Sequence, residues 1–143
     1  MNNSLRIAAL AAVMLGTTSQ AFAGVGSDMA QAHFEAIGAG DVAAISSAYT
    51  DASVFQWVGG PLDGEYRGKD AIAGVWQKFT KAQGPIEVTV GEVVENANPK
   101  GVTVTADVTF KGKATVPVRY VLTYRGDALV SEIWQIDPNL GKY

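Results

Sequence analysis

The second half of the chain alternates hydrophobic and polar residues with the period of a β-strand. From residue 102 to residue 110 every even position is apolar, and the odd positions carry threonine or aspartate. Successive side chains of a strand point to opposite faces of a sheet, so this segment predicts a strand with one buried and one solvated face. Further strands are predicted at 86–94, 115–124 and 129–136, separated by turns at 96–101, 111–113 and 125–127.

Hydrophobic residues in the first part of the chain follow helical spacing instead. A helix is expected to begin at Ser27 or Asp28, because either side chain can cap it, and to end at Gly38 and Gly40. Its predicted buried face has members three or four residues apart, namely Met29, Ala32, His33, Ala36 and Ile37.

Two more helices and a short strand are expected before the sheet. Asp41 is predicted to cap a helix at 42–49, and a third helix is predicted at 69–81. Between them lie a strand at 54–58 and a glycine-rich loop at 59–64. Helices followed by consecutive antiparallel strands predict an α+β fold, with the helices packed on one side of a strongly bent sheet.

The first residues read as a secretory signal peptide. Arg6 precedes an apolar run at 7–15, and a small-x-small site ends at Ala23. The run is too short to cross a hydrocarbon layer of ~30 Å, and the next residue is not the cysteine that a lipid anchor needs. We therefore expect cleavage after Ala23, a periplasmic or secreted bacterial protein with no membrane attachment, and a single domain at 24–143.

Composition excludes several classes of function. The net charge is −3, and the basic residues are scattered, so nucleic acid is not an expected partner. The absence of cysteine excludes disulfides and thiolate chemistry. His33 is the single histidine, and no ligand pair has spacing suited to a metal, so neither a metal nor another cofactor is expected. The loop at 59–64 lacks the lysine that a phosphate-binding loop carries.

Four segments, in this order and spacing, resemble the NTF2-like superfamily and specifically SnoaL-like domains. They are Phe34–Asp41, Tyr49–Phe55, Gly60–Trp76 and Val130–Asp137. The resemblance implies a cone, in which a strongly curved antiparallel sheet wraps around three N-terminal helices and leaves an apolar cavity open at one end. It also implies that the sheet can pair two copies into a homodimer.

The isomerases of this superfamily supply a test for catalytic residues. They carry a tyrosine eight residues before the aspartate that corresponds to Asp41, and here that position is His33. Their general base, an aspartate on the first strand, corresponds to Gln56. An amide accepts no proton at neutral pH, and a shift of one residue brings Phe55 or Trp57, which are not bases either. The sequence therefore favours a protein without that isomerase activity.

Several side chains remain as candidates for the site. His33 is interpreted either as a donor in the cavity or as a histidine packed between helix and sheet and bonded to the backbone. Arg119 could pair with Asp107 or Glu132, which would more often be a feature of the sheet surface. Trp76 is interpreted as a core residue. For Trp57, the sequence favours a pocket position and a core position equally. The complete set of predicted ligand-binding residues is His33, Gln56, Trp57, Tyr66, Trp76, Arg119 and Trp134.

Three functions are compatible with this pattern. The first is an exported domain that binds a small apolar or aromatic molecule in its cone cavity. The second is an isomerase, dehydratase or cyclase in which His33 works with Asp63 or Glu132. The third is a homodimeric interaction scaffold.

Overall fold

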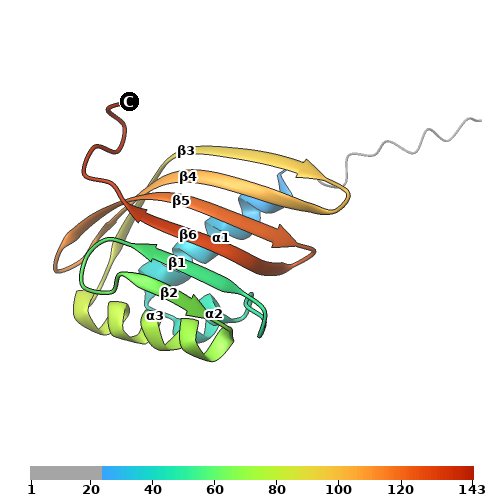
Figure 1. Cartoon of the computed structure of the whole chain (residues 1–143). Coiled ribbons are helices and arrows are strands. Elements are labelled where there is room, and N and C mark those ends of the chain that lie inside the picture. Colours follow the sequence, from blue (N-terminus) through green and yellow to red (C-terminus); the bar gives the residue numbers. More distant parts are fainter. Residues whose placement is uncertain (1–23) are drawn as a thin grey trace, which may run out of the picture.

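The computed structural model describes residues 24–143, and the predicted signal peptide at 1–23 lies outside them (Figure 1). Three helices and six strands follow one another: α1 (Val25–Ala39), α2 (Val42–Ser46), β1 (Val54–Val58), β2 (Gly64–Arg67), α3 (Lys69–Gln83), β3 (Glu87–Asn98), β4 (Gly101–Lys111), β5 (Thr115–Arg125) and β6 (Ala128–Ile136).

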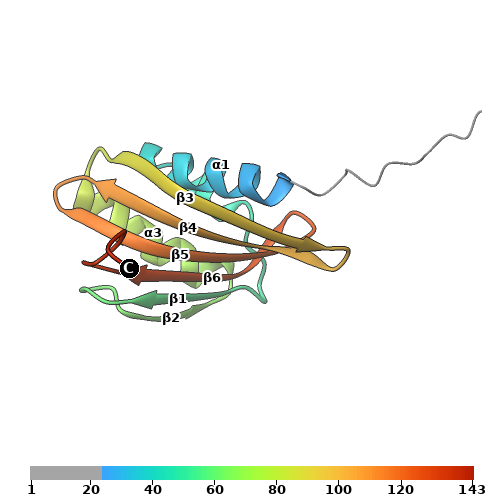
Figure 2. The same ribbon diagram turned by 90° about the horizontal axis from the view of Figure 1, so that it is seen from above.

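The six strands form one sheet in the order β2-β1-β6-β5-β4-β3. All neighbours are antiparallel except β1 and β6, which run parallel. Helix α3 carries the chain from β2 at one edge to β3 at the other. Figures 1 and 2 show the curved sheet with α1 along β3 and β4, and with α3 beside β2. The predicted α+β fold with a curved sheet and N-terminal helices is confirmed.

The alternation of β4 places its apolar side chains inside, as the sequence predicts. Every even residue from Val102 to Phe110 is buried, and every odd one from Thr103 to Thr109 is partly exposed. The same face of β6 carries Trp134 and Glu132, both buried. The inner face of the sheet is therefore apolar apart from a few polar groups, which makes those groups conspicuous.

Strand β2 was not expected from the sequence. It has only four residues and one apolar side chain, Tyr66, so no alternation identifies it. The strand exists because it pairs antiparallel with β1, from Val54 opposite Arg67 to Trp57 opposite Gly64. The predicted loop at 59–64 is thus the connection of a β-hairpin.

The buried face of α1 is also rotated from the prediction. Ala30 and Phe34 are fully buried, whereas Ala32 is exposed and Met29 and Ala36 are partly exposed. His33 and Ile37 are buried as predicted. The rotation follows from contact with the sheet, because a stripe of alanines leaves the helical period ambiguous.

Both ends of α1 illustrate how local and distant residues cap a helix. Gly40 ends it in the left-handed conformation with φ 66°, as the sequence predicts. At the start, neither Ser27 nor Asp28 is the capping residue. Instead the Glu95 carboxylate on β3 accepts hydrogen bonds from the backbone N–H groups of Gly24 (3.0 Å) and Ser27 (2.7 Å) and from the Ser27 hydroxyl (2.8 Å). A strand carboxylate therefore satisfies the N-terminus of α1.

Replacing Glu95 should test this cap. Partial burial acts to raise the pKa of Glu95, but hydrogen bonds from Ser27 and Gly24 outweigh it and lower the pKa below 4.5. The ionised form is thus favoured in the folded state, and its stabilisation is complete above pH 4.5 and lost as the pH falls. We expect Glu95→Gln to lower the free energy of unfolding by about 1 kcal/mol at pH 7 in urea titrations.

The difference in the free energy of unfolding between the unchanged protein and Glu95→Gln should shrink at pH 3. Glu92→Gln, which changes an exposed carboxylate of the same strand, is the matched control and should leave the unfolding midpoint unchanged. Equal effects of the two substitutions would show that Glu95 contributes no specific cap.

Candidate functional site

Glu132 is the one buried carboxylate among residues 24–143, with no exposed surface. It lies on the inner face of β6 beside Trp134, where the surrounding side chains are hydrophobic. A carboxylate removed from water is very costly unless other groups hydrogen-bond to it or pair with it. The groups that satisfy Glu132 therefore define the polar centre of the molecule.

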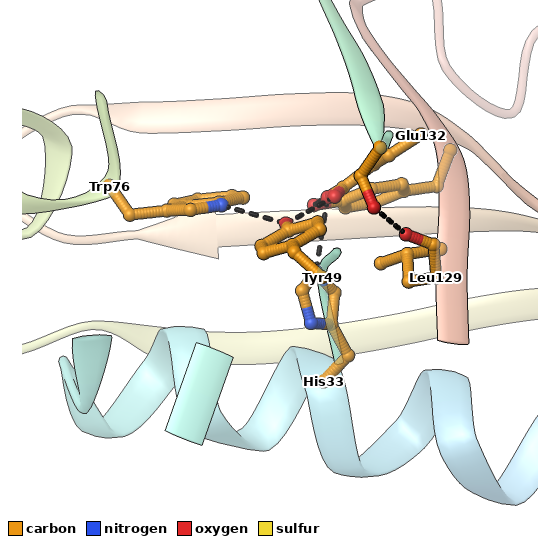
Figure 3. A network of polar contacts seen from close by, with 7 residues as sticks. His33, Tyr49, Trp76, Leu129 and Glu132 are labelled. Carbon is orange, nitrogen blue, oxygen red and sulfur yellow. Dashed lines mark hydrogen bonds and ion pairs between the residues drawn. The ribbon is translucent and has the colours of Figure 1, made fainter. Parts of the chain in front are cut away.

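Three side chains from different elements converge on this carboxylate (Figure 3). His33 Nε2 on α1 lies 3.0 Å from Oε1, and the Tyr120 hydroxyl on β5 donates to the same oxygen at 2.6 Å. The Tyr49 hydroxyl donates to Oε2. Behind it, Trp76 Nε1 on α3 donates to the Tyr49 hydroxyl at 2.9 Å. We call these five residues the Glu132 network.

Local structure explains why His33 and Tyr120 reach the carboxylate. The rotated face of α1 turns His33 toward the sheet, where its ring has edge contacts with the rings of Tyr49, Trp76 and Tyr120 at 5.9–6.3 Å. In the β5–β6 hairpin, Leu122 lies opposite Glu132, and Tyr120 is two residues further along on the same face. A long aromatic side chain spans that diagonal.

The tyrosines of this region are held in their protonated form. Burial raises the pKa of Tyr49 and Tyr120 well above the ordinary value, and the nearby Glu132 charge raises both further. The pKa of Tyr124 is also raised, mainly by burial and further by the nearby Glu132 charge. At neutral pH these hydroxyls are therefore donors, and two of them point at the carboxylate. The arrangement can hold a negative charge in an apolar interior and can orient the His33 ring.

Aromatic side chains occupy the interior next to this network. Trp57 stacks on Trp134 at 4.5 Å, Trp134 stacks on Phe110 at 4.8 Å, and Phe55 stacks on Trp76 at 5.3 Å. The indole N–H groups of Trp57 and Trp134 are buried without a hydrogen-bond partner among residues 24–143. Unpaired buried donors of this kind are rare, because each costs about 1–3 kcal/mol.

A pocket of about 330 Å³ lies at one end of this aromatic interior. It is found where β1 and β6 end and β5 begins, between the β1–β2 loop and the last turns of α3. We call it the end pocket; its lining residues are Trp57, Pro61, Leu62, Lys78, Phe79, Ala82, Gln83, Val116 and Ile136.

Other predicted site residues lie elsewhere. Gln56 and Arg119 are on the outer face of the sheet, where Gln56 donates to Glu65 and Arg119 pairs with Asp107 at 2.7 Å. The structure therefore brings neither of them to His33. Because strand residues alternate, the inner residues of β1 are Phe55 and Trp57, and neither can act as a base.

The β1–β2 hairpin holds two more predicted residues. The Asp63 carboxylate accepts the Gly59 backbone N–H at 2.7 Å, and the half-buried Tyr66 donates its hydroxyl to the Leu62 carbonyl at 2.7 Å. Both side chains stabilise the hairpin connection. Of the predicted partners for His33, the structure thus brings Glu132 to it, and Asp63 remains in the exposed loop.

Sequence reasoning missed Tyr49 and Tyr120 as partners of Glu132. The turn at 125–127 predicts the β5–β6 hairpin, but a register shift between Thr123 and Tyr124 separates that turn from Tyr120, so the turn alone does not place Tyr120 diagonally from Glu132. No local signal identifies Tyr49, which reaches the carboxylate from the turn after α2. Within residues 24–143, no cluster of side chains could hold a metal ion, and the helices there are not long and apolar enough to cross a membrane.

Removing one hydroxyl from the Glu132 network should be costly. We expect Tyr120→Phe to lower the free energy of unfolding by about 2 kcal/mol, because hydrogen bonds to charged groups contribute more than neutral ones. Tyr66→Phe is the matched control, since it deletes a hydroxyl bonded to a backbone carbonyl, and about 1 kcal/mol or less is expected. Urea unfolding measures both. An equal loss would show that the buried carboxylate adds nothing to the Tyr120 hydrogen bond.

Alkaline pH should destabilise the fold through the same tyrosines. Their pKa is raised in the folded state, so above pH 10 the unfolded chain releases protons that the folded protein retains. Stability then falls as the pH rises, by up to about 1.4 kcal/mol per pH unit for each tyrosine. Urea midpoints between pH 9 and 11 measure how steeply stability falls with pH. Tyr124→Phe should reduce this slope by the contribution of one tyrosine. An unchanged slope in that variant would contradict the raised pKa of Tyr124.

Solved structures of other proteins share this fold. An NTF2-like protein of unknown function from Pseudomonas putida is 17% identical with a TM-score of 0.66, over 76% of this chain and 82% of that chain. An NTF2-like protein of unknown function from Cytophaga hutchinsonii is 14% identical with a TM-score of 0.61, over 79% of this chain and 90% of that one.

A third similar structure is a hypothetical protein with a ketosteroid isomerase-like fold from Catenulispora acidiphila, solved in complex with trimethylamine. It is 18% identical with a TM-score of 0.59, over 79% of this chain and 88% of that chain. No curated protein matches the chain. The family model of the SnoaL-like domain matches residues 30–130, most of the chain. The fold is therefore NTF2-like, and the protein belongs to the SnoaL-like domain family.

Proposed function

We propose that this SnoaL-like domain binds a small, largely apolar molecule that carries a hydrogen-bond acceptor, and that it does so in the end pocket. The observation that carries the proposal is the unpaired indole N–H of Trp57, a residue that also lines the pocket. Ligand sites are commonly concave and apolar with a few polar groups that fix orientation. A bound acceptor that displaces the atoms covering this N–H would satisfy a buried donor that the protein leaves unpaired.

The lining of the end pocket defines the class of ligand. Phe79, Leu62, Val116 and Ile136 supply apolar surface, and the Trp57 ring supplies a face for stacking. Lys78 is the charged residue at the rim, and it lies on the exposed face of α3, which leaves its ammonium group in water. A one- or two-ring molecule with a carbonyl or ether oxygen matches this surface better than a sugar or a nucleotide.

The hydrogen bond between His33 and Glu132 favours a second candidate, an enzyme that uses them as an acid–base pair. A carboxylate that orients an imidazole is a common catalytic arrangement. Here, however, Oε1 already accepts from His33 and Tyr120, and Oε2 accepts from Tyr49. Packed aromatic rings surround these atoms. Because those bonds already satisfy a buried charge, we rank the enzyme below the binding domain.

Ligand binding can be tested with 1-tetralone as the probe and with tetralin as the matched hydrocarbon that lacks the acceptor. We expect 1-tetralone to change the intrinsic tryptophan fluorescence saturably and tetralin to bind more weakly. Trp57→Phe keeps an aromatic ring and removes the N–H. It should therefore weaken the binding of 1-tetralone about fivefold, as expected for one lost hydrogen bond, and leave the binding of tetralin unchanged.

Two alanines of α3 provide a second control. Ala82 lines the end pocket and is exposed, so Ala82→Leu should fill the pocket and weaken binding without disturbing the core. Ala71→Leu changes an exposed alanine at the other end of the helix and should have no effect. Binding that survives Ala82→Leu, or no binding at millimolar 1-tetralone, would refute the proposal.

A further inference from the structure

The Glu95 carboxylate contacts the residue that directly follows the predicted cleavage site. Glu95 lies near the end of β3, beside the first turn of α1 (Figures 1 and 2). Its Oε1 accepts a hydrogen bond from the Gly24 nitrogen at 3.0 Å, and its Oε2 accepts one from the Ser27 nitrogen at 2.7 Å. In the uncleaved chain the Gly24 nitrogen belongs to the peptide bond with Ala23, so it offers one uncharged N–H group.

Hydrolysis of that peptide bond changes the charge of the same nitrogen. As the C–N bond breaks, the oxygen of one water molecule joins the Ala23 carbonyl carbon, and both of its protons go to the Gly24 nitrogen. The products are an Ala23 carboxylate, which leaves with the predicted signal peptide, and a Gly24 ammonium group. The contact between Gly24 and Glu95 then joins opposite charges, so Coulomb attraction is added to the hydrogen bond.

The start of a helix is an unfavourable place for a positive charge. Gly24 is the N-cap residue of α1, where the helix dipole has its positive end. An ammonium group at this position is repelled by the dipole unless a negative charge lies close to it. Glu95 supplies that charge from β3, at hydrogen-bond distance from Gly24. The cleaved chain therefore depends on Glu95 more than the uncleaved chain does.

Three other charged residues lie around the start of α1. Asp28 is in the first turn of the helix, and Lys100 and Asp127, from the β3–β4 and β5–β6 turns, line a pocket together with Val25. All three charged residues are exposed, so solvent and salt screen their effect on Gly24. Within residues 24–143, none of the three accepts a hydrogen bond from the Gly24 nitrogen.

We propose that Glu95 is the binding site for the new N-terminus of the mature protein, and that cleavage after Ala23 converts its hydrogen bond with Gly24 into an ion pair that fastens α1 to β3. The inference is independent of ligand binding in the end pocket, whose lining includes neither residue. It also makes the position of the cut important, because a chain that begins one residue earlier or later carries its ammonium group away from Glu95.

Urea unfolding of the mature protein tests the ion pair. The chain that begins with a free Gly24 amine is compared with the same chain acetylated at Gly24, because acetylation keeps an N–H donor and removes the charge. At pH 7, Glu95→Gln should lower the equilibrium constant for folding about threefold more in the free-amine chain than in the acetylated chain, as expected for one partly exposed ion pair. Glu92→Gln, on the same strand, should affect the two chains equally.

The pH dependence of this difference separates an ion pair from an ordinary cap. An α-amino group ordinarily loses its proton at about pH 8, and a neighbouring carboxylate raises its pKa in the folded state. The stabilisation by the ammonium group is therefore complete below about pH 8 and is lost as the pH rises further. It is also lost as the pH falls below 4.5 and Glu95 takes up a proton. The acetylated chain should show only the loss at acid pH.

Two results would overturn the proposal. Equal effects of Glu95→Gln on the free-amine and acetylated chains at pH 7 would show that Glu95 caps either form of the nitrogen and makes no ion pair. Mass spectrometry of the full-length chain after export from a Gram-negative host gives the first residue of the mature protein, and Gly24 is expected. An intact leader or another first residue would separate the Glu95 contact from processing.

Discussion

The burial of the Glu132 carboxylate is the constraint on which the rest of the structure depends. A charged group in an apolar interior must be hydrogen-bonded, and its donors come from α1, the turn after α2 and β5. Apolar contacts alone hold a helix against a sheet with little directional preference. The hydrogen bonds of the Glu132 network require α1 and α2 to lie at particular positions, which also explains why the buried face of α1 is turned from the face that its alanines suggest.

The same constraint explains why the proposed ligand site lies at the margin of the molecule. The carboxylate oxygens are occupied, and stacked rings such as Trp57, Trp134 and Phe110 occupy the adjacent interior. Among residues 24–143, the buried polar groups left without partners are instead the Trp57 and Trp134 indoles and the Ser46 and Tyr124 hydroxyls. A group whose hydrogen bonds are complete stabilises the fold, and the proposed function assigns a ligand to the unpaired Trp57 donor beside the end pocket.

Family membership fits this division between fold and site. The similar structures are less than 25% identical to this chain, so they establish the shared architecture and leave function to the particular side chains. In this chain β1 presents Phe55 and Trp57 to the interior, and Gln56 faces outward. The inward positions of that strand are hydrophobic, which suits binding better than proton transfer.

The sequence by itself determined most of the elements, because strand alternation in β4, the Asp41 cap and the Gly40 terminus are decided by neighbouring residues. It also placed His33 on the buried face of a helix and named Glu132 as a possible partner for it. Only the tertiary structure decided that they meet, that Tyr49 completes the carboxylate's hydrogen bonds, and that Glu95 caps α1. These contacts join residues 68–99 positions apart, where short-range patterns carry no information. Strand β2 belongs with them, since four mostly polar residues form a strand only when β1 is present to pair with them.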